Sequence, residues 1–320
     1  MTLDHAELVA EKLPWALKRN AAGLVAFAAF IHLRQEVHVK RTLVPGLAAP
    51  FTDNETLQSF YFTNIFREAD NGTKYYRRQI LNQHEELSQE KLPEILFQTY
   101  IYRCVNKVIT FQRFGGIPAE KDWDKFRGFM CSSMQDKTEE NFFTQAHINQ
   151  GQNKTALTIE YVLEHKEKMA RQISSATSLK TVFEIIRTAP HVGPFLSWQI
   201  TADLCELKLI RLKENFVALG PGAQAGLKKV LGEKFRGSEE LEMTKTLTKL
   251  MKPVFRQLDM NFQYFLGRDM SLKAIEHSLC EFDKYYRAAL GKLYFLLSEL
   301  YPLQIFREEE QEDLSRRRGV

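Results

Sequence analysis

Residues 191–204 read HVGPFLSWQITADL, and they place a Val-Gly-Pro turn at the start of an apolar helix. We expect HVGP to form a tight turn and the helix to follow it from Phe195; in an ordinary helical corner Pro194 would occupy the first helical position, which proline favours. The preceding residues 184–190, EIIRTAP, are expected to form a short helix. The two helices make a candidate helix-hairpin-helix unit, in which free amides at the second helix's N-terminus receive a DNA phosphate. An ordinary helical corner has the same signature.

The rest of the chain also has a helical pattern. Only 16 of the 320 residues are Gly and 10 are Pro, and apolar residues recur every three or four positions. We therefore predict an all-α fold. Residues 1–50 are expected to form N-terminal helices packed on the core, residues 51–300 a helical domain of one or two lobes, and residues 301–320 a charged tail.

Composition excludes several classes of protein. The net charge of +4 favours a polyanionic partner only weakly. The four cysteines form no CxxC pair and fit no zinc spacing, so we expect reduced thiols, no metal and a cytoplasmic location, in the host cytoplasm if the protein is viral. The apolar run at 21–31 is too short to span a bilayer, so no membrane partner is expected. The basic continuation at 32–41 fits either a solvated helix face or a phosphate-binding face.

Two segments carry polar stripes on otherwise apolar helices. Residues 61–76 are predicted to be one helix, with Thr63, Arg67 and Asp70 on one face and Asn64 beside them. An Arg67–Asp70 surface ion pair explains this spacing. A cleft wall that offers a planar guanidinium to phosphate explains it too. Residues 96–114 are predicted to be one long helix whose stripe suits a hydrogen-bonded ligand: Thr99, Arg103, Asn106, Thr110 and Arg113.

The helix after the first turn is expected to run over 195–210 and to carry Gln199, Asp203 and Glu206 on one stripe. Apolar neighbours would desolvate the Asp203 carboxylate and raise its pKa, so that it acts as a base near neutrality. A satisfied structural aspartate is the alternative.

A second glycine turn lies at 218–224, ALGPGAQ. It fits GxGxxA superficially, but no βαβ context surrounds it and GxxxxGK is absent, so neither a dinucleotide site nor a P-loop is indicated. We read it as a further helix N-terminus for phosphate, followed by Lys228 and Lys229.

Five segments together carry a family resemblance: FTNIFREAD (62–70), YIYRCVNKVITF (100–111), HVGPFLSWQITADL (191–204), ALGPGAQAGLKK (218–229) and IEHSLCEFDKYYR (275–287). Their order and spacing resemble the amino acid:DNA transferase family, also described as the helical domain associated with 5-hydroxymethyluracil DNA kinases. The resemblance covers about residues 28–290. It implies a fold similar to helix-hairpin-helix DNA glycosylases, with helical extensions, and a place among bacteriophage enzymes that hypermodify thymine.

The resemblance also implies a reaction. A 5-pyrophosphoryloxymethyl-uracil in duplex DNA loses pyrophosphate, and an amine or amino acid is joined to the exocyclic carbon. The implied partners are double-stranded DNA carrying the modified thymine, a small amine or amino acid, and a 5-hydroxymethyluracil DNA kinase, with no cofactor. Because the methyl position of a stacked base is inaccessible, the nucleotide must be flipped out.

We assign candidate roles on this basis. Asp203 is the expected base and Glu281 its alternative, while Arg67, with Asp70 in the same group, stabilises the departing pyrophosphate. Cys280 is a candidate nucleophile, although a buried free cysteine explains it as well. The expected substrate-binding residues are Asn64, Gln199, Asn106, Lys107 and Arg77, and the expected DNA-binding residues are His191, Gly193, Gly220, Gly222, Lys228 and Lys284.

Two other functions remain open at this point. A glycosylase-like enzyme is disfavoured because Gly220 stands where glycosylases of this fold have an essential Asp, and Glu214 is the nearest acid. A noncatalytic helix-hairpin-helix DNA-binding protein is the other alternative. The transferase hypothesis requires the two glycine turns to lie together beside one cavity lined by Arg67 and Asp203.

Overall fold

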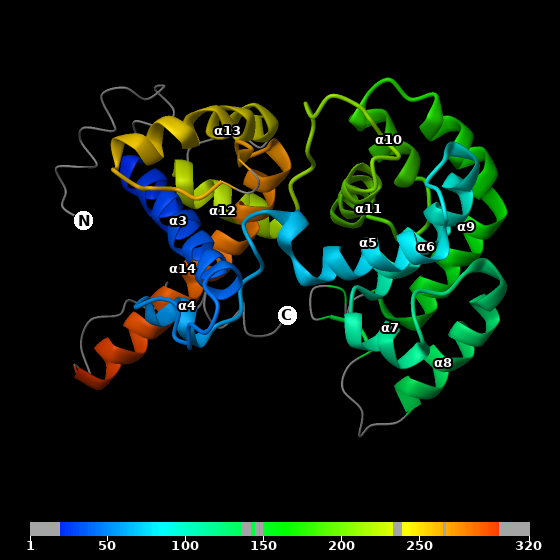
Figure 1. The fold of residues 1–320 in the computed structure, drawn as a ribbon, viewed down its shortest axis with the longest axis horizontal. Helices are drawn as coiled ribbons and strands as arrows, with labels where there is room; N and C mark the ends of the chain where they lie inside the picture. Colours follow the sequence, from blue (N-terminus) through cyan, green and yellow to red (C-terminus); the bar gives the residue numbers. More distant parts are fainter. Residues whose placement is uncertain are drawn as a thin grey trace.

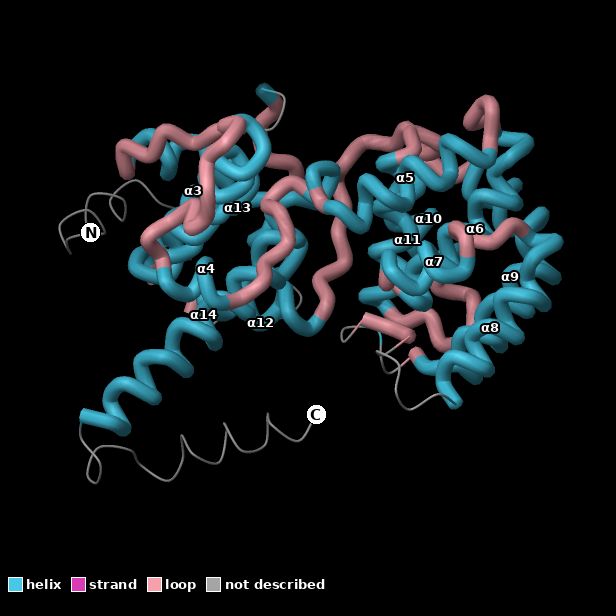
Figure 2. Tube along the Cα trace, turned by 60° about the horizontal axis from the view of Figure 1, so that its bottom comes forward, coloured by secondary structure: helices cyan, strands magenta, loops and turns pink. Residues whose placement is uncertain are grey.

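The computed structural model describes residues 20–135, 142–144, 147, 150–232, 239–264 and 267–300. All regular elements in these ranges are helices, which confirms the all-α prediction. The predicted tail at 301–320 and the first 19 residues of the chain lie outside the described residues. Figure 1 shows the helices gathered in two lobes side by side, and Figure 2 shows the same two groups from another direction.

The first lobe, here called the terminal lobe, combines both ends of the described chain. Its core contains Leu24, Phe27, Leu227, Leu247 and Ile275, none of which has exposed surface. Leu24 and Phe27 belong to the first described helix, so this helix shares a core with helices from the C-terminal part of the chain. The lobe comprises α3 (Ala21–Leu43), α4 (Glu55–Ser59), α12 (Pro221–Leu231), α13 (Glu240–Gln257) and α14 (Leu272–Leu300).

The second lobe, here called the central lobe, is formed by the intervening chain. Its separate core is built around the nearly all-buried α6, which packs against α9 and α11. The lobe comprises α5 (Asn71–Gln83), α6 (Leu92–Val105), α7 (Val108–Phe114), α8 (Trp123–Gln135), α9 (Gly151–Ser174), α10 (Leu179–Ile186) and α11 (Pro194–Glu206), with short 3-10 turns at η2 (Gln89–Lys91) and η3 (Glu120–Asp122).

Small residues let α12 and α14 pack closely. A Cβ atom at Gly222 would lie 2.6 Å from Cys280 Sγ, and one at Gly226 would collide with the backbone carbonyl of Leu279. Contacts this short force neighbouring atoms to move. The glycines of GPGAQAG therefore serve helix packing within the terminal lobe.

The predicted helix over 61–76 is wrong in its first half. Residues 60–66 are not helical, η1 (Arg67–Ala69) is a single 3-10 turn, and α5 starts at Asn71. The cause is side-chain competition for backbone groups. Arg34 donates to the Phe62 carbonyl oxygen at 3.0 Å and to Asn64 Oδ1 at 2.8 Å, while Asp70 Oδ1 accepts from the Asn64 amide at 3.2 Å.

The predicted single helix over 96–114 is also wrong, because it breaks at Asn106. Asn106 has φ +54° and caps α6, and its amide donates to the Tyr102 carbonyl oxygen at 2.6 Å. Asparagine tolerates this left-handed conformation better than most residues. The polar stripe of the predicted helix is therefore divided between α6 and α7.

The helix after the first glycine turn starts close to the expected residue, but the helix ends differ. Gly193 is the N-cap of α11 and Pro194 occupies its first turn, so the helix starts one residue before the expected Phe195. However, α10 ends at Ile186, short of the predicted limit at 190, and α11 ends at Glu206, short of the predicted limit at 210. The left-handed residue of the turn is His191, with φ +60°.

Candidate functional site at the seam between the lobes

Helix α11 belongs to the central lobe and faces the terminal lobe. The Trp198 indole N–H donates to Glu276 Oε2 of α14 at 3.1 Å, and Lys273 donates to Glu206 Oε1. Between these contacts, Gln199 and Asp203 meet Arg67. The predicted stripe of Gln199, Asp203 and Glu206 thus faces the junction of the lobes, which we call the seam.

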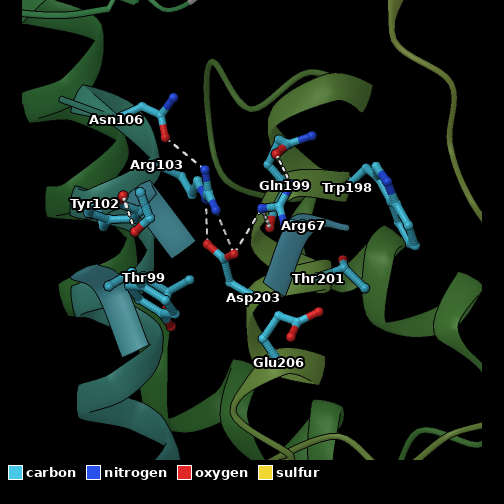
Figure 3. Close-up of polar contacts among 12 residues, drawn as sticks. Arg67, Thr99, Tyr102, Arg103, Asn106, Trp198, Gln199, Thr201, Asp203 and Glu206 are labelled. Carbon is cyan, nitrogen blue, oxygen red and sulfur yellow. Dashed lines mark hydrogen bonds and ion pairs between the residues drawn. The ribbon is translucent and has the colours of Figure 1, made fainter. Parts of the chain in front are cut away.

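Two arginines, one from η1 and one from α6, converge on one carboxylate in the seam. Arg67 Nη2 donates to Asp203 Oδ1 at 2.8 Å, and Arg103 Nη2 donates to the same oxygen at 2.6 Å while its Nε donates to Oδ2. Arg67 also donates to Gln199 Oε1, and Arg103 donates to Asn106 Oδ1 at 2.7 Å. Figure 3 shows the two guanidinium groups flanking the Asp203 carboxylate. The Arg67–Asp70 surface ion pair considered from spacing is therefore replaced by a long-range pair.

The prediction of a raised pKa for Asp203 is wrong. Burial by itself raises the pKa of this carboxyl, but the ion pairs with Arg103 and Arg67 outweigh burial and hold the pKa below its usual value. The Asp203 side chain has no exposed surface. It therefore lines no open cavity and is a poor proton acceptor, so Arg67 and Asp203 do not line the solvent-open cavity that was expected.

The buried cluster contains nitrogen atoms without a hydrogen-bond partner. Arg67 Nε has no partner among the described residues, and water does not reach it because the residue is only 3% exposed. His147 Nε2 is also buried without a partner. Burial, with smaller contributions from the nearby charges of Arg103 and Arg67, lowers the pKa of His147 to about 3, so the ring is neutral. One carboxylate, Asp203, is thus shared by two guanidinium groups.

A rim of half-buried polar groups adjoins this buried cluster. Glu281 Oε2 accepts from the Thr63 amide at 2.9 Å, and the Thr63 hydroxyl lies 2.9 Å from His277 Nε2. Burial lowers the pKa of His277, while Asp70 and Glu281 oppose that shift and Arg67 and Arg103 add to it. The candidates Asn64, Asp70 and Glu281 therefore share one neighbourhood with Arg67.

The two glycine turns lie side by side, but they differ in exposure. A Cβ atom at Gly220 would lie 2.8 Å from the Phe195 side chain, which follows Pro194 in the first turn. His191 and Gly193 are exposed, whereas Gly220 is buried and Gly222 is half-buried against Cys280. Phe195 and α14 therefore crowd the α carbons of Gly220 and Gly222, which gives both glycines a packing role. Gly193 is the more exposed glycine, and DNA contact at either turn stays a prediction.

The remaining predicted residues lie away from the buried pair of arginines. Arg77 lies on the outer surface of α5, where it lines a shallow groove with Lys74 and Arg78. Lys107 is the N-cap of α7 and directly follows Asn106. Lys284 donates to the Tyr61 carbonyl oxygen and lies 3.8 Å from Glu281 Oε2, while Lys228 is exposed near the end of α12.

Three further candidates have structural explanations. Burial raises the pKa of the Cys280 thiol to about 12, so the thiolate needed for nucleophilic attack is suppressed. Thr99 and Thr110 are buried and bind within the protein: the Thr99 hydroxyl lies 2.6 Å from that of Tyr76, and Thr110 donates to the Phe142 carbonyl oxygen at 2.8 Å. Neither threonine is available to a ligand.

The sequence patterns gave no role to several groups around the seam. His277 is spaced i and i+4 with the candidate Glu281 on α14, so helical spacing alone would have paired it with that residue. Arg34 lies in the basic stretch 32–41, whose pattern fits a solvated helix face, so its buried role could not be recognised from the sequence. His147 lies in a segment without hydrophobic periodicity, where no local pattern reveals its position.

The sequence of the chain matches a known family over most of its length. The profile described as "5-hmdU DNA kinase, helical domain" matches residues 22–294. The chain belongs to this family. The 5-hmdU DNA kinase of Bacillus phage SP10 is 25% identical over 286 residues, which cover 80% of this chain and 44% of the relative. The chain thus spans less than half the length of that kinase. No solved structure is significantly similar to it.

The described residues contain neither a candidate metal-binding cluster nor a helix that could span a membrane. Their His, Cys, Asp and Glu side chains form no group of three suited to a metal ion. None of the helices in the same residues is long and apolar enough to cross a bilayer.

Proposed function

We propose that this chain is a DNA-modifying transferase in thymine hypermodification. In the proposed reaction, the exocyclic C–O bond of 5-pyrophosphoryloxymethyl-uracil breaks and pyrophosphate leaves with the electron pair. A C–N bond forms to an amine or amino acid, and the amine's proton passes to a base. Membership of the 5-hmdU DNA kinase helical-domain family supports a substrate derived from 5-hydroxymethyluracil in DNA.

The observation that carries the proposal is the arginine pair of the seam. Arg67 and Arg103 share the single Asp203 carboxylate, and Arg67 Nε has no partner among the described residues. Planar guanidinium groups match the oxygens of phosphate and stabilise charge that develops on a leaving group. In the proposal Asp203 is a positioning residue that holds the two guanidinium groups in place.

The proton acceptor in this proposal comes from the rim. In this proposal the imidazole of His277, which lies 2.9 Å from the Thr63 hydroxyl, takes a proton from the incoming amine. Glu281, which is bound to the Thr63 amide and adjoins His277, remains the alternative base. Because Arg67 is only 3% exposed, a flipped nucleotide requires the lobes to separate along the seam.

A glycosylase activity has less support. Gly220, at the position where that activity would need a carboxylate, is buried beneath Phe195. Glu214 Oε1 accepts from the Lys273 amide at 2.6 Å, near the start of α14, and so serves that helix. The closed seam instead favours a noncatalytic DNA-binding module as the second candidate. The chain lacks the phosphate-binding motif GxxxxGK, so a separate kinase would supply the phosphoryl chemistry. The module would present the base to that kinase.

The test incubates the protein with DNA that a 5-hmdU kinase system has pyrophosphorylated and with a mixture of amino acids and polyamines. Mass spectrometry of the nucleosides and release of pyrophosphate are the readouts. Amine-dependent release with a new aminated nucleoside is expected. Arg67→Lys should lower the rate by at least about tenfold, because Lys keeps the charge but loses the planar donor pair.

Arg127→Lys is the matched control, since Arg127 forms a surface ion pair with Glu160 at 2.8 Å and should tolerate the same change. Abasic sites formed without amine would establish glycosylase chemistry and contradict the transfer. DNA binding with unchanged bases would favour the noncatalytic module.

A further inference from the structure

All the charged side chains of helix α5 are positive. Lys74, Arg77 and Arg78 line a shallow groove with Leu81 and Asn82, and no acidic residue occurs anywhere in α5. We call this surface the α5 basic face. The whole chain has 44 Lys and Arg against 40 Asp and Glu, so a patch without a carboxylate departs from the average mixture.

Helix α9 shows what a mixed solvated face looks like in this chain. Its sequence alternates acids and bases, and ion pairs join Lys166 to Glu167 at 3.6 Å and Arg127 of α8 to Glu160 at 2.8 Å. The cations of the α5 basic face have no ion pair with any described residue. Their charge is therefore left for a partner.

The positive surface continues onto the end of α3. Burial lowers the pKa of His38, and the charges of Lys74, Arg34 and Arg41 lower it further, so these cations lie near one another although α3 and α5 belong to different lobes. Figure 1 shows α5 beginning at the junction of the lobes, while α3 lies in the terminal lobe. Asp70, the N-cap residue of α5, opposes them at His38.

We propose that the α5 basic face and the C-terminal end of α3 bind the phosphate backbone of duplex DNA and deliver the target nucleotide to the seam. The choice of DNA rests on the proposed function. Lys74 and Arg78 are separated by about 6 Å along the helix axis, which is close to the roughly 7 Å along the duplex axis between phosphates that lie two steps apart on one strand.

The rest of α5 does not suit a membrane surface. Its apolar side, with Tyr76 and Ile80, is buried in the central lobe. Leu81 is the large apolar side chain that the helix exposes, at 50%. An interfacial helix needs a broad free apolar face to enter the bilayer. A polyanion that is held by charge alone fits the surface better.

The test compares two triple variants that remove the same charge. One is Lys74→Gln/Arg77→Gln/Arg78→Gln. The control is Lys168→Gln/Arg171→Gln/Lys180→Gln, which removes three exposed cations from α9 and α10. Binding to an unmodified 20-base-pair duplex is measured by fluorescence anisotropy over a series of salt concentrations.

The α5 variant should lose at least about tenfold in affinity, and its salt dependence should fall by about 2 to 3 in log–log slope, since each lost phosphate contact removes about 0.9. The control should change affinity by less than about twofold. Equal losses in both variants, or no loss in the α5 variant, would overturn the proposal. So would a loss of binding to anionic phosphatidylserine vesicles with DNA affinity intact.

Failure of this surface is distinguishable from failure of the transferase. If the wild-type protein binds DNA through α5 but releases no pyrophosphate from activated DNA, the surface stands and the proposed reaction fails. If the α5 variant releases pyrophosphate at the wild-type rate and also keeps the wild-type DNA affinity, the reaction stands and the surface fails.

Discussion

Arg67 and Asp203, which are 136 positions apart, lie 2.8 Å from each other across the seam. Both side chains are at most 4% exposed, so the pair is shielded from water. Such a buried pair costs desolvation when it forms and leaves an uncompensated charge when one member is removed. The seam therefore couples the position of the terminal lobe to that of α11.

The first prediction concerns the stability of this pair. Asp203→Ala leaves the Arg67 and Arg103 guanidinium groups buried without a carboxylate, so unfolding free energy should fall by about 3–5 kcal/mol. Denaturant titration followed by tryptophan fluorescence measures the change. Asp269→Ala is the control, because the exposed Lys252–Asp269 pair at 2.8 Å should contribute less than about 1 kcal/mol. Equal losses of unfolding free energy in the two variants would show that the buried pair contributes no more to stability than an exposed pair.

The second prediction separates two glycines by the space around them. A Cβ atom at Gly193 would meet nothing within 4 Å, whereas one at Gly226 would collide with the Leu279 backbone. Gly193→Ala should therefore leave unfolding free energy within about 0.5 kcal/mol. It should still weaken DNA binding by about tenfold if a phosphate contacts this backbone.

Gly226→Ala is the matched comparison. It should cost about 1–3 kcal/mol of stability through overpacking of α12 against α14. Denaturant titration and DNA anisotropy on the same samples separate the two effects. Unchanged DNA affinity in a folded Gly193→Ala protein would exclude the first turn as a DNA contact.

The third prediction concerns the pH dependence of stability. Burial raises the pKa of Glu276 from 4.5 to about 7, although the Trp198 N–H and Arg67 lower it in part. Below pH 4.5 the carboxyl is protonated in both folded and unfolded chains, so its contribution to stability is fully present. That contribution is lost as pH rises through about 7, because the folded chain must then hold a buried charge.

Glu276→Gln removes this titration while keeping an acceptor for Trp198. The variant should match the wild type near pH 4 and exceed it at pH 8 by up to about 3 kcal/mol, at about 1.4 kcal/mol per pKa unit. Denaturant titrations at both pH values measure the difference. A difference that is independent of pH would contradict the raised pKa.

The fourth prediction concerns Cys280. With its thiol pKa raised to about 12 and its sulfur packed near Gly222, this cysteine should resist alkylation by iodoacetamide at pH 8 in the folded protein and react after unfolding. Peptide mass spectrometry measures the modification. Cys280→Ala should retain pyrophosphate release within about threefold, since loss of a small buried side chain mainly affects stability. Rapid alkylation of the folded chain, or loss of release, would restore Cys280 as a nucleophile candidate.

Sequence reasoning worked where local rules decide structure. Helical periodicity gave the all-α class, the Val-Gly-Pro turn marked the start of α11 to within one residue, and the i, i+4, i+7 spacing put Gln199, Asp203 and Glu206 on one stripe. It failed at 60–66 and at Asn106. There, hydrogen bonds from Arg34 and a left-handed cap replaced helical bonding.

The sequence by itself thus determined that Asp203 lies on a polar stripe of an apolar helix that follows the Val-Gly-Pro turn. Only the tertiary structure decided what that carboxylate does. Its charge state depends on Arg67 and Arg103, which come from elements 136 and 100 positions away. Burial alone raises a carboxyl pKa and two adjacent guanidinium groups lower it. Because that balance is set by packing between two lobes, no local pattern contains its sign.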